Sequence, residues 1–266
     1  ESFRLGIGAA EWKKGNLIAV PKKGPVSADN TRPIVLLSHV SKVVMKIISR
    51  RLLVMKLDYR QFAFRPMRGT AEAIHTLNVV TQERARRGHA TYATYVDMTG
   101  AFDRLRQDRL FEALRAAGHH ENTISFIRSL YDGASLAIAG SKLSFPSAHG
   151  VRQGCVASPI LFSIAIAQAI RLAESDPTFT PFLIQCGDSL VDLSSLLYAD
   201  DIAILSDTPE HLQRNTDLIA RALATFGFTL NTKKCKAQVF PPQIRNQTLG
   251  TAEHTARYAA ERPLSS

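Results

Sequence analysis

Two adjacent aspartates, Asp200 and Asp201, stand between short apolar runs at residues 195–198 and 202–205. Such runs are typical of β-strands, and the polar pair between them is typical of a hairpin turn. Neighbouring carboxylates repel each other and lose hydration at the edge of a core. Contact with water or a nearby cation must offset this cost. The stretch therefore predicts either a solvated, aspartate-rich turn or a cation-binding site.

Composition narrows the classes of protein to consider. The 266 residues suffice for one large domain or two modest ones. Lys plus Arg (33) minus Asp plus Glu (23) gives a formal charge of +10, which suits nucleic acid as a partner but also fits a generally basic protein. The three cysteines include no C-x-x-C pair, which argues against a disulfide framework or zinc ribbon and favours a reducing compartment.

The sequence shows neither a membrane span nor a signal peptide. No apolar run reaches the roughly 18 residues of a membrane span. No signal-peptide pattern opens the chain. We therefore expect an intracellular protein that is neither secreted nor membrane-bound.

Strands and helices alternate without a regular βαβ rhythm, which favours an α+β fold with an antiparallel sheet and helices packed on one face. The expected strands cover 16–20, 34–37, 91–96, 135–139, 142–145, 195–198, 202–205, 228–230 and 236–240. The expected helices follow capping side chains at 38, 70, 158 and 208, and also cover 105–117 and 122–131.

The strand at 91–96 delivers Asp97 at its end. If this strand neighbours the hairpin, three carboxylates converge at one edge of a sheet, which is tolerable only with cations between them. Hard oxygen ligands suit Mg²⁺, and two such ions are a standard apparatus for in-line displacement at phosphorus. Alternatively, Asp97 is only a strand-end cap. Asp103 is better explained as a helix-start or surface residue.

A glycine-flanked loop at 150–154 precedes the helix that begins near residue 158. Glycines at both ends would let the backbone approach a ligand closely, and Gln153 offers a donor and an acceptor. By itself, however, this loop is better explained as a loop-to-helix turn.

Taken in order, these blocks resemble the palm of reverse transcriptases. The palm blocks read VDMTGAFD at 96–103, GVRQGCVASPILF at 150–162 and YADD at 198–201. Upstream, TRPIVLL at 31–37 and QFAFRP at 61–66 look like fingers blocks of non-LTR (LINE-type) retrotransposon enzymes. Downstream, GFTLNTKKCK at 227–236 is similar to the family's block after the catalytic hairpin. Several collinear blocks are much more specific than any one of them.

The resemblance implies the fingers and palm of a right-hand polymerase fold. The implied division is fingers at 1–90, palm at 91–105, a fingers–palm connection at 106–152, palm at 153–250 and a truncated tail at 251–266. The tail does not continue the family's next block recognisably, so we expect the thumb to be absent.

The resemblance also implies the residues of a metal site. Asp97, Asp200 and Asp201 would be catalytic and would bind two Mg²⁺ ions, with Mn²⁺ able to substitute. The backbone carbonyl of Met98 would complete the shell of one ion.

Six further residues would bind the incoming nucleotide: Lys22, Lys23, Arg32, Phe102, Gln153 and Lys234. One of the two lysines, with Arg32, would grip the triphosphate, and which lysine does so stays open. Phe102 would exclude a 2′-hydroxyl beneath the sugar, unless it only packs in the core. Gln153 would shape the pocket, and Lys234 would protonate the leaving pyrophosphate, unless it is only a solvated charge. Template or primer contacts are implied for Arg65, Gly154 and Tyr198.

The function implied is reverse transcription, in which an RNA template directs extension of a DNA primer with dNTPs. The protein would act in the nucleus or cytoplasm as a ribonucleoprotein. Two alternatives remain: a reverse transcriptase of another retroelement, such as a group II intron, and a degenerate or domesticated copy that only binds RNA through its basic surface.

Overall fold

The structure is a computed structural model that describes residues 6–21, 31–55 and 57–243. It divides into two compact units. The first comprises Glu1–Tyr59, Gly100–Ile170 and Leu223–Phe228, and the second comprises Arg60–Thr99, Arg171–Ala222 and Thr229–Ser266.

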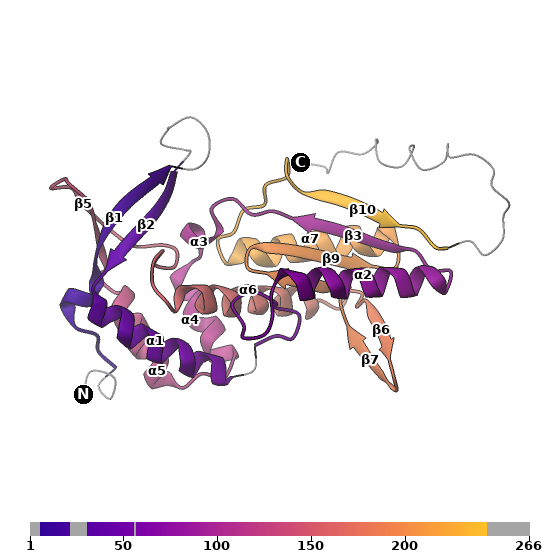
Figure 1. The fold of residues 1–266 in the computed structure, drawn as a ribbon, viewed down its shortest axis with the longest axis horizontal. Coiled ribbons are helices and arrows are strands. Elements are labelled where there is room, and N and C mark those ends of the chain that lie inside the picture. The colour runs from indigo at the N-terminus through magenta and orange to yellow at the C-terminus, as the bar shows by residue number, and fades with distance from the viewer. Residues whose placement is uncertain (1–5, 22–30, 56, 244–266) are drawn as a thin grey trace. The chain divides into compact units, whose positions relative to one another are not determined.

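The first unit contains a small sheet and a set of helices. Its strands run in the order β2-β1-β4-β5, with β1 and β4 parallel and the other pairs antiparallel. Figure 1 shows β1 and β2 side by side as a long hairpin. The strands are β1 (Lys14–Pro21), β2 (Thr31–Leu37), β4 (Ser135–Ile138) and β5 (Ser144–Pro146). The helices are η1 (Ala10–Lys13), α1 (His39–Val54), α3 (Ala101–Arg104), α4 (Gln107–Ala116), α5 (Glu121–Tyr131) and most of α6 (Ser158–Glu174).

The core of the first unit lies among α4, α5 and α6. Leu110 and Leu114, four residues apart on α4, are fully buried, as are Ile124 and Ile127 on α5. Helix α6 begins at Ser158 and is apolar almost all round, so most of its side chains as far as Ile170 are buried. Helices α4 and α5 form where apolar spacing predicts them. Ser158, expected to cap α6, is its first residue instead and donates its hydroxyl to the carbonyl of Arg152.

The second unit is built on a four-stranded antiparallel sheet in the order β10-β3-β9-β8. The strands are β3 (Thr91–Val96), β8 (Ser195–Tyr198), β9 (Asp201–Ser206) and β10 (Lys236–Phe240). A separate hairpin joins β6 (Leu183–Cys186) to β7 (Ser189–Asp192). The helices are α2 (Thr70–Arg86) and α7 (Pro209–Thr225), whose last residues belong to the first unit.

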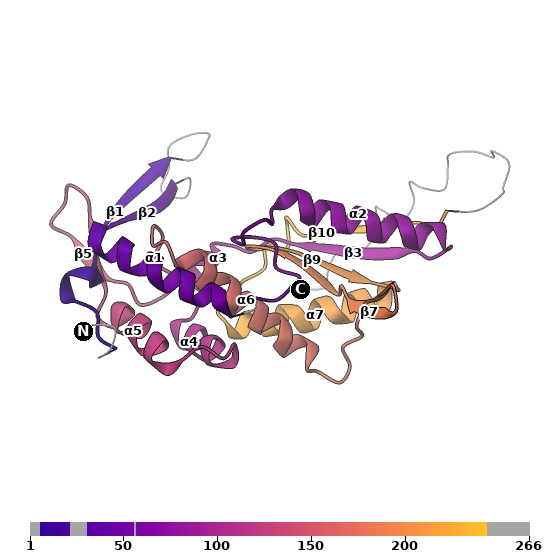
Figure 2. The same ribbon diagram turned by 60° about the horizontal axis from the view of Figure 1, so that its bottom comes forward.

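Helices cover both faces of this sheet. Val80 of α2 packs with Ala93 and Leu205 of the sheet in a buried cluster. Helix α7 lies on the opposite face (Figure 2). The α+β class and the antiparallel sheet are confirmed, but the helices lie on two faces of the sheet, whereas we expected them on one. Strand β9 explains this, since it buries apolar side chains on both sides.

Two local expectations differ from the structure. The strand expected at 228–230 is reduced to one bridge between Leu230 and Met98. The hairpin of β6 and β7 carries no alternating apolar pattern, and we did not predict it. Within the described ranges, every helix is too short or too polar to cross a membrane.

Candidate active site

The second unit brings the three aspartates together at one end of the strands of its sheet. Strands β3 and β9 are antiparallel and pair Val96 with Ile202. Continuing this register by one residue puts Asp97 opposite Asp201. Strands β8 and β9 form a hairpin whose two-residue turn contains Asp200. Asp97, which is far from the Asp200–Asp201 pair in the sequence, therefore lies next to it at the ends of the two central strands.

The hairpin turn has an unusual backbone. Ala199, which precedes Asp200, has φ of 55° and is buried. This left-handed conformation costs a residue other than glycine about 1–2 kcal/mol, so other contacts must hold it. The amide of Ala199 donates to Oε1 of Gln61 at 3.3 Å. Gln61 is fully buried, and our sequence analysis missed it because nothing near it in the chain indicates this contact.

The carboxylates lie close enough to affect one another. Partial burial raises the pKa of Asp201, and the charges of Asp200 and Asp97 raise it further. The Nζ atom of Lys234 lies 3.7 Å from Oδ2 of Asp97. Because the Lys234 side chain is 68% exposed, this ion pair is worth only about 0–1 kcal/mol. Lys234 therefore compensates only part of the negative charge.

The backbone of Met98 adds an oxygen on the same edge. The carbonyl of Asp97 and the amide of Thr99 both bond to the 229–231 segment, at 2.8 and 2.9 Å. Alternate residues of an extended strand direct their backbone groups to opposite sides. The carbonyl of Met98 therefore points away from that segment, toward the side on which β3 borders β9.

The donor types at this edge fit Mg²⁺, which favours a few carboxylates and carbonyls at sites that also bind phosphate. The raised pKa of Asp201 has a like-charge contribution that a cation would relieve. However, no three His, Cys, Asp or Glu side chains within residues 6–21, 31–55 and 57–243 are arranged to ligate one metal ion.

Phe102 lies in the first unit, on α3. Its ring stacks on Phe162 of α6, with centroids 4.2 Å apart and planes 10° apart. Phe162 is fully buried, while Phe102 is half-buried. Core packing thus fixes one face of the Phe102 ring and leaves the residue partly accessible.

The loop at 150–154 is held to β2 of the same unit. The carbonyl of Gln153 accepts from the amide of Val35 at 2.8 Å, and its side-chain Nε2 donates to Oδ1 of Asp103. Gly154 has φ of 107°, and an added Cβ would lie 2.2 Å from the carbonyl oxygen of Val35. A glycine is therefore required here by the close approach of two backbones.

The remaining predicted site residues are only partly described. Lys22 and Lys23 lie outside the described residues, and Arg32 is placed by its backbone in the β1–β2 ladder. In the second unit, Nη1 of Arg65 donates to the backbone carbonyl of Gln61 at 3.3 Å. Tyr198 is half-buried at the end of β8, next to the aspartate turn.

Comparisons with curated proteins give relatives from retrotransposons. The chain is 27% identical over 181 residues to the retrovirus-related Pol polyprotein of the type-2 element R2DM of Drosophila melanogaster, covering 67% of the chain and 16% of that protein. It is 28% identical over 256 residues to the RNA-directed DNA polymerase of the mobile element jockey of the same species, covering 89% and 26%. The chain thus spans about a quarter or less of the length of these relatives.

Solved structures with a similar fold include telomerases. The apo telomerase of Candida tropicalis, truncated from its C-terminal domain, aligns with a TM-score of 0.63 at 15% identity, covering 88% of this chain and 51% of that one. A telomerase of Candida albicans with a telomeric RNA fragment aligns with a TM-score of 0.61 at 13% identity, covering 92% and 44%. At these identities the likeness concerns the fold alone.

The family comparison covers most of the chain. Residues 20–258 match the family described as reverse transcriptase (RNA-dependent DNA polymerase). Together with the R2 and jockey relatives, this confirms the resemblance to non-LTR retrotransposon enzymes. The chain belongs to the reverse transcriptase family.

Proposed function

We propose that this chain carries the catalytic centre for RNA-templated DNA synthesis. The observation that supports it most is the β3–β9 register, which puts Asp97 opposite Asp201 with Asp200 in the adjoining turn. Family membership and the printed name of the jockey relative, an RNA-directed DNA polymerase, agree with this chemistry. The proposed partners are an RNA template, a DNA primer and dNTPs, within an intracellular ribonucleoprotein.

In the proposed reaction, the primer 3′-oxygen bonds to the α-phosphorus of the dNTP while the bond to pyrophosphate breaks. When bound, two Mg²⁺ ions would lower the pKa of the 3′-hydroxyl and neutralise charge on the triphosphate. Asp97, Asp200, Asp201 and the Met98 carbonyl would hold these ions. Lys234, beside Asp97, would transfer a proton to the leaving pyrophosphate.

The remaining roles are proposed from the family motifs. Lys22 or Lys23, with Arg32, would bind the triphosphate, and Gln153 would shape the nucleotide pocket. Arg65, Gly154 and Tyr198 would contact template or primer. The division into fingers and palm stays a prediction, as does the absence of a thumb.

Primer extension tests this function directly. We expect the intact protein to extend a DNA primer on an RNA template with dNTPs, to stop when EDTA removes Mg²⁺ and to resume when Mg²⁺ is restored. Binding of the same hybrid, measured by fluorescence anisotropy, separates the rival function. A protein that binds the hybrid but makes no product with Mg²⁺ or Mn²⁺ would support the RNA-binding alternative instead.

Mg²⁺ should also stabilise the fold, because it relieves the repulsion among the three aspartates. At about 100 times its Kd, a ligand specific to the folded state contributes about 2.7 kcal/mol, or about 5–10 °C in Tm for a chain of this size. Differential scanning fluorimetry at constant ionic strength measures the shift. An equal shift in Asp200→Asn plus Asp201→Asn would show that Mg²⁺ acts elsewhere.

Phe102→Ala should weaken sugar discrimination. The family motif places this ring beneath the sugar, where it would exclude a 2′-hydroxyl, and Phe162 holds the ring in place. Its removal should therefore lower the preference for dNTPs over rNTPs by about 10- to 200-fold in kcat/KM. Single-nucleotide incorporation with dNTP and rNTP measures the ratio. Phe102→Tyr keeps the ring and should keep the preference, and an unchanged ratio in Phe102→Ala would remove this assignment.

A further inference from the structure

The 60–63 segment lies along β8, the edge strand of the four-stranded sheet in the second unit. The amide of Leu197 donates to the carbonyl of Arg60 at 2.9 Å, and the amide of Phe62 donates to the carbonyl of Leu197 at 2.8 Å. Gln61 thereby forms a parallel bridge with Leu197 of β8. The segment is thus fixed to the strand that leads into the aspartate turn.

The Gln61 side chain links this segment to the turn itself. Its Oε1 accepts from the amide of Ala63 at 3.0 Å and from that of Ala199 at 3.3 Å. Its Nε2 is buried and has no hydrogen-bond partner within the part of the chain that the structure describes. The two accepted bonds therefore orient the side chain, and one of them holds the left-handed residue that precedes Asp200.

We propose that Gln61 is a positioning residue that sets the conformation of the Ala199–Asp200 turn and so aims Asp200 and Asp201. The inference rests on the proposed polymerase function. A methionine would fill the same volume without an acceptor and would leave two buried amides unsatisfied, so the turn would relax toward an ordinary backbone conformation. A small displacement of reacting groups is enough to cost a large factor in rate.

Steady-state kinetics of primer extension test this role. Gln61→Met should lower kcat by at least about tenfold, since misplacement by about 1 Å can cost a hundredfold. The KM for dNTP and the Kd for primer–template should stay within about twofold, because Gln61 is buried and contacts neither. Val80→Ala removes a buried side chain of α2 that packs on the same sheet. It is the matched control for a general loss of stability and should keep kcat.

A second substitution distinguishes positioning from packing. Glycine adopts a left-handed backbone without cost, so Ala199→Gly should reduce the dependence of the turn on Gln61. We expect the double variant Gln61→Met plus Ala199→Gly to recover kcat at least about threefold over Gln61→Met, a non-additive effect typical of coupled sites. A folded Gln61→Met with wild-type kcat, or a double variant without recovery, would overturn the inference.

Amide hydrogen exchange tests the bond between Ala199 and Gln61 in the wild-type protein, without a substitution. The Ala199 amide should exchange at least about tenfold more slowly than an unprotected amide of the same sequence. An unprotected Ala199 amide would overturn the inference even if Gln61→Met failed to fold. An inactive wild-type protein would instead count against the proposed function, and the exchange result would still report on the contact.

Discussion

Replacing Asp200 and Asp201 together with asparagine is expected to abolish DNA synthesis. Each carboxylate is proposed to hold the ions that carry the reaction, and the metals contribute several kcal/mol to transition-state stabilisation. A loss of that size lowers the rate by at least about a thousandfold. The measurement is single-turnover primer extension on an RNA template.

Binding and folding must survive for this result to be informative. Asp200 lies in the turn and Asp201 is the first residue of β9, so the variant should keep its fold and bind primer–template within about twofold. Asp188→Asn, in the exposed turn between β6 and β7, removes one carboxylate elsewhere and should leave the rate unchanged. More than a few per cent residual activity in the double variant would exclude these aspartates as the metal site.

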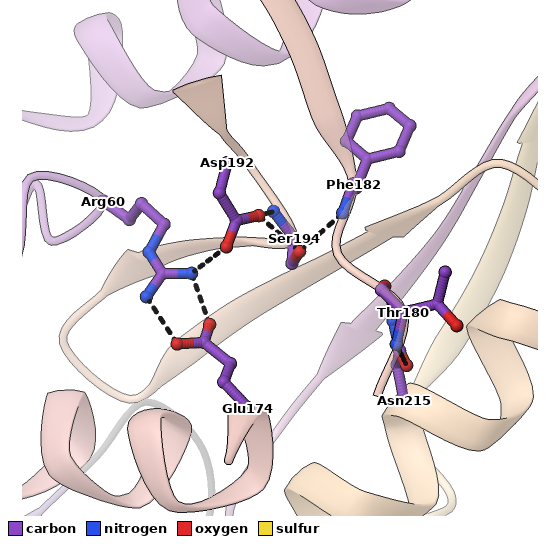
Figure 3. A network of polar contacts seen from close by, with 7 residues as sticks. All are labelled: Arg60, Glu174, Thr180, Phe182, Asp192, Ser194 and Asn215. Atoms are coloured by element: carbon purple, nitrogen blue, oxygen red, sulfur yellow. Dashed lines mark hydrogen bonds and ion pairs between the residues drawn. The ribbon is translucent and has the colours of Figure 1, made fainter. Parts of the chain in front are cut away.

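Replacing Arg60 with methionine is expected to produce the largest loss of stability. The Arg60 side chain is 5% exposed and forms a bidentate pair with Glu174, in which Nη2 lies 3.0 Å from Oε2. Its Nη1 also lies 3.4 Å from Oδ2 of Asp192 (Figure 3). Replacing Arg60 removes the buried guanidinium that pairs with two partly buried carboxylates, and breaking a buried ion pair costs about 3–5 kcal/mol of the free energy of unfolding.

The loss should spread beyond the ion pair. Oδ1 of Asp192 accepts from the amide of Ser194 at 2.8 Å, and Oγ of Ser194 accepts from the amide of Phe182 at 2.8 Å, as Figure 3 shows. Arg60 thus anchors both the β6–β7 hairpin and the segment that carries Gln61.

Urea unfolding measures the effect. Arg86→Met, which removes an exposed ion pair with Glu83 in the same unit, should change the free energy of unfolding by less than about 0.5 kcal/mol. Adding Glu174→Gln and Asp192→Asn to Arg60→Met should recover much of the loss, because both carboxylate charges that Arg60 paired with are then removed as well. A change below about 1 kcal/mol for Arg60→Met would contradict the account of this network.

The parts of the site that the sequence predicts correctly are those set by local patterns. The apolar runs around Asp200 and the strand before Asp97 form β8, β9 and β3 as expected. We expected the three aspartates to converge if the strand before Asp97 neighbours the hairpin. The pairing of β3 with β9 meets this condition. The helices that follow Ser38 and Thr208 likewise begin where they were expected, and these two side chains accept from the amides of Ser41 and His211. The cap expected at Thr70 was wrong, because α2 already begins at Thr70 and follows Gly69.

The features that sequence analysis missed depend on contacts between distant residues. Gln61 is buried because its backbone pairs with Leu197, far along the chain. Arg60 was overlooked because both of its partners are distant in the sequence. Glu174 is the last residue of α6, and Asp192 ends the hairpin that we did not predict. That hairpin has mostly exposed strands, so it lacks the apolar alternation by which strands are recognised.

The most direct test of the central claim is a crystal structure of the protein with a chain-terminated primer on its RNA template, the next dNTP and Mn²⁺. The account predicts two anomalous peaks about 4 Å apart, within ligand distance of Asp97 and Asp201, with Asp200 on at least one of them. Asp97→Asn should weaken or remove both peaks. Mn²⁺ bound only to the nucleotide, with Asp97 turned away from Asp201, would contradict it.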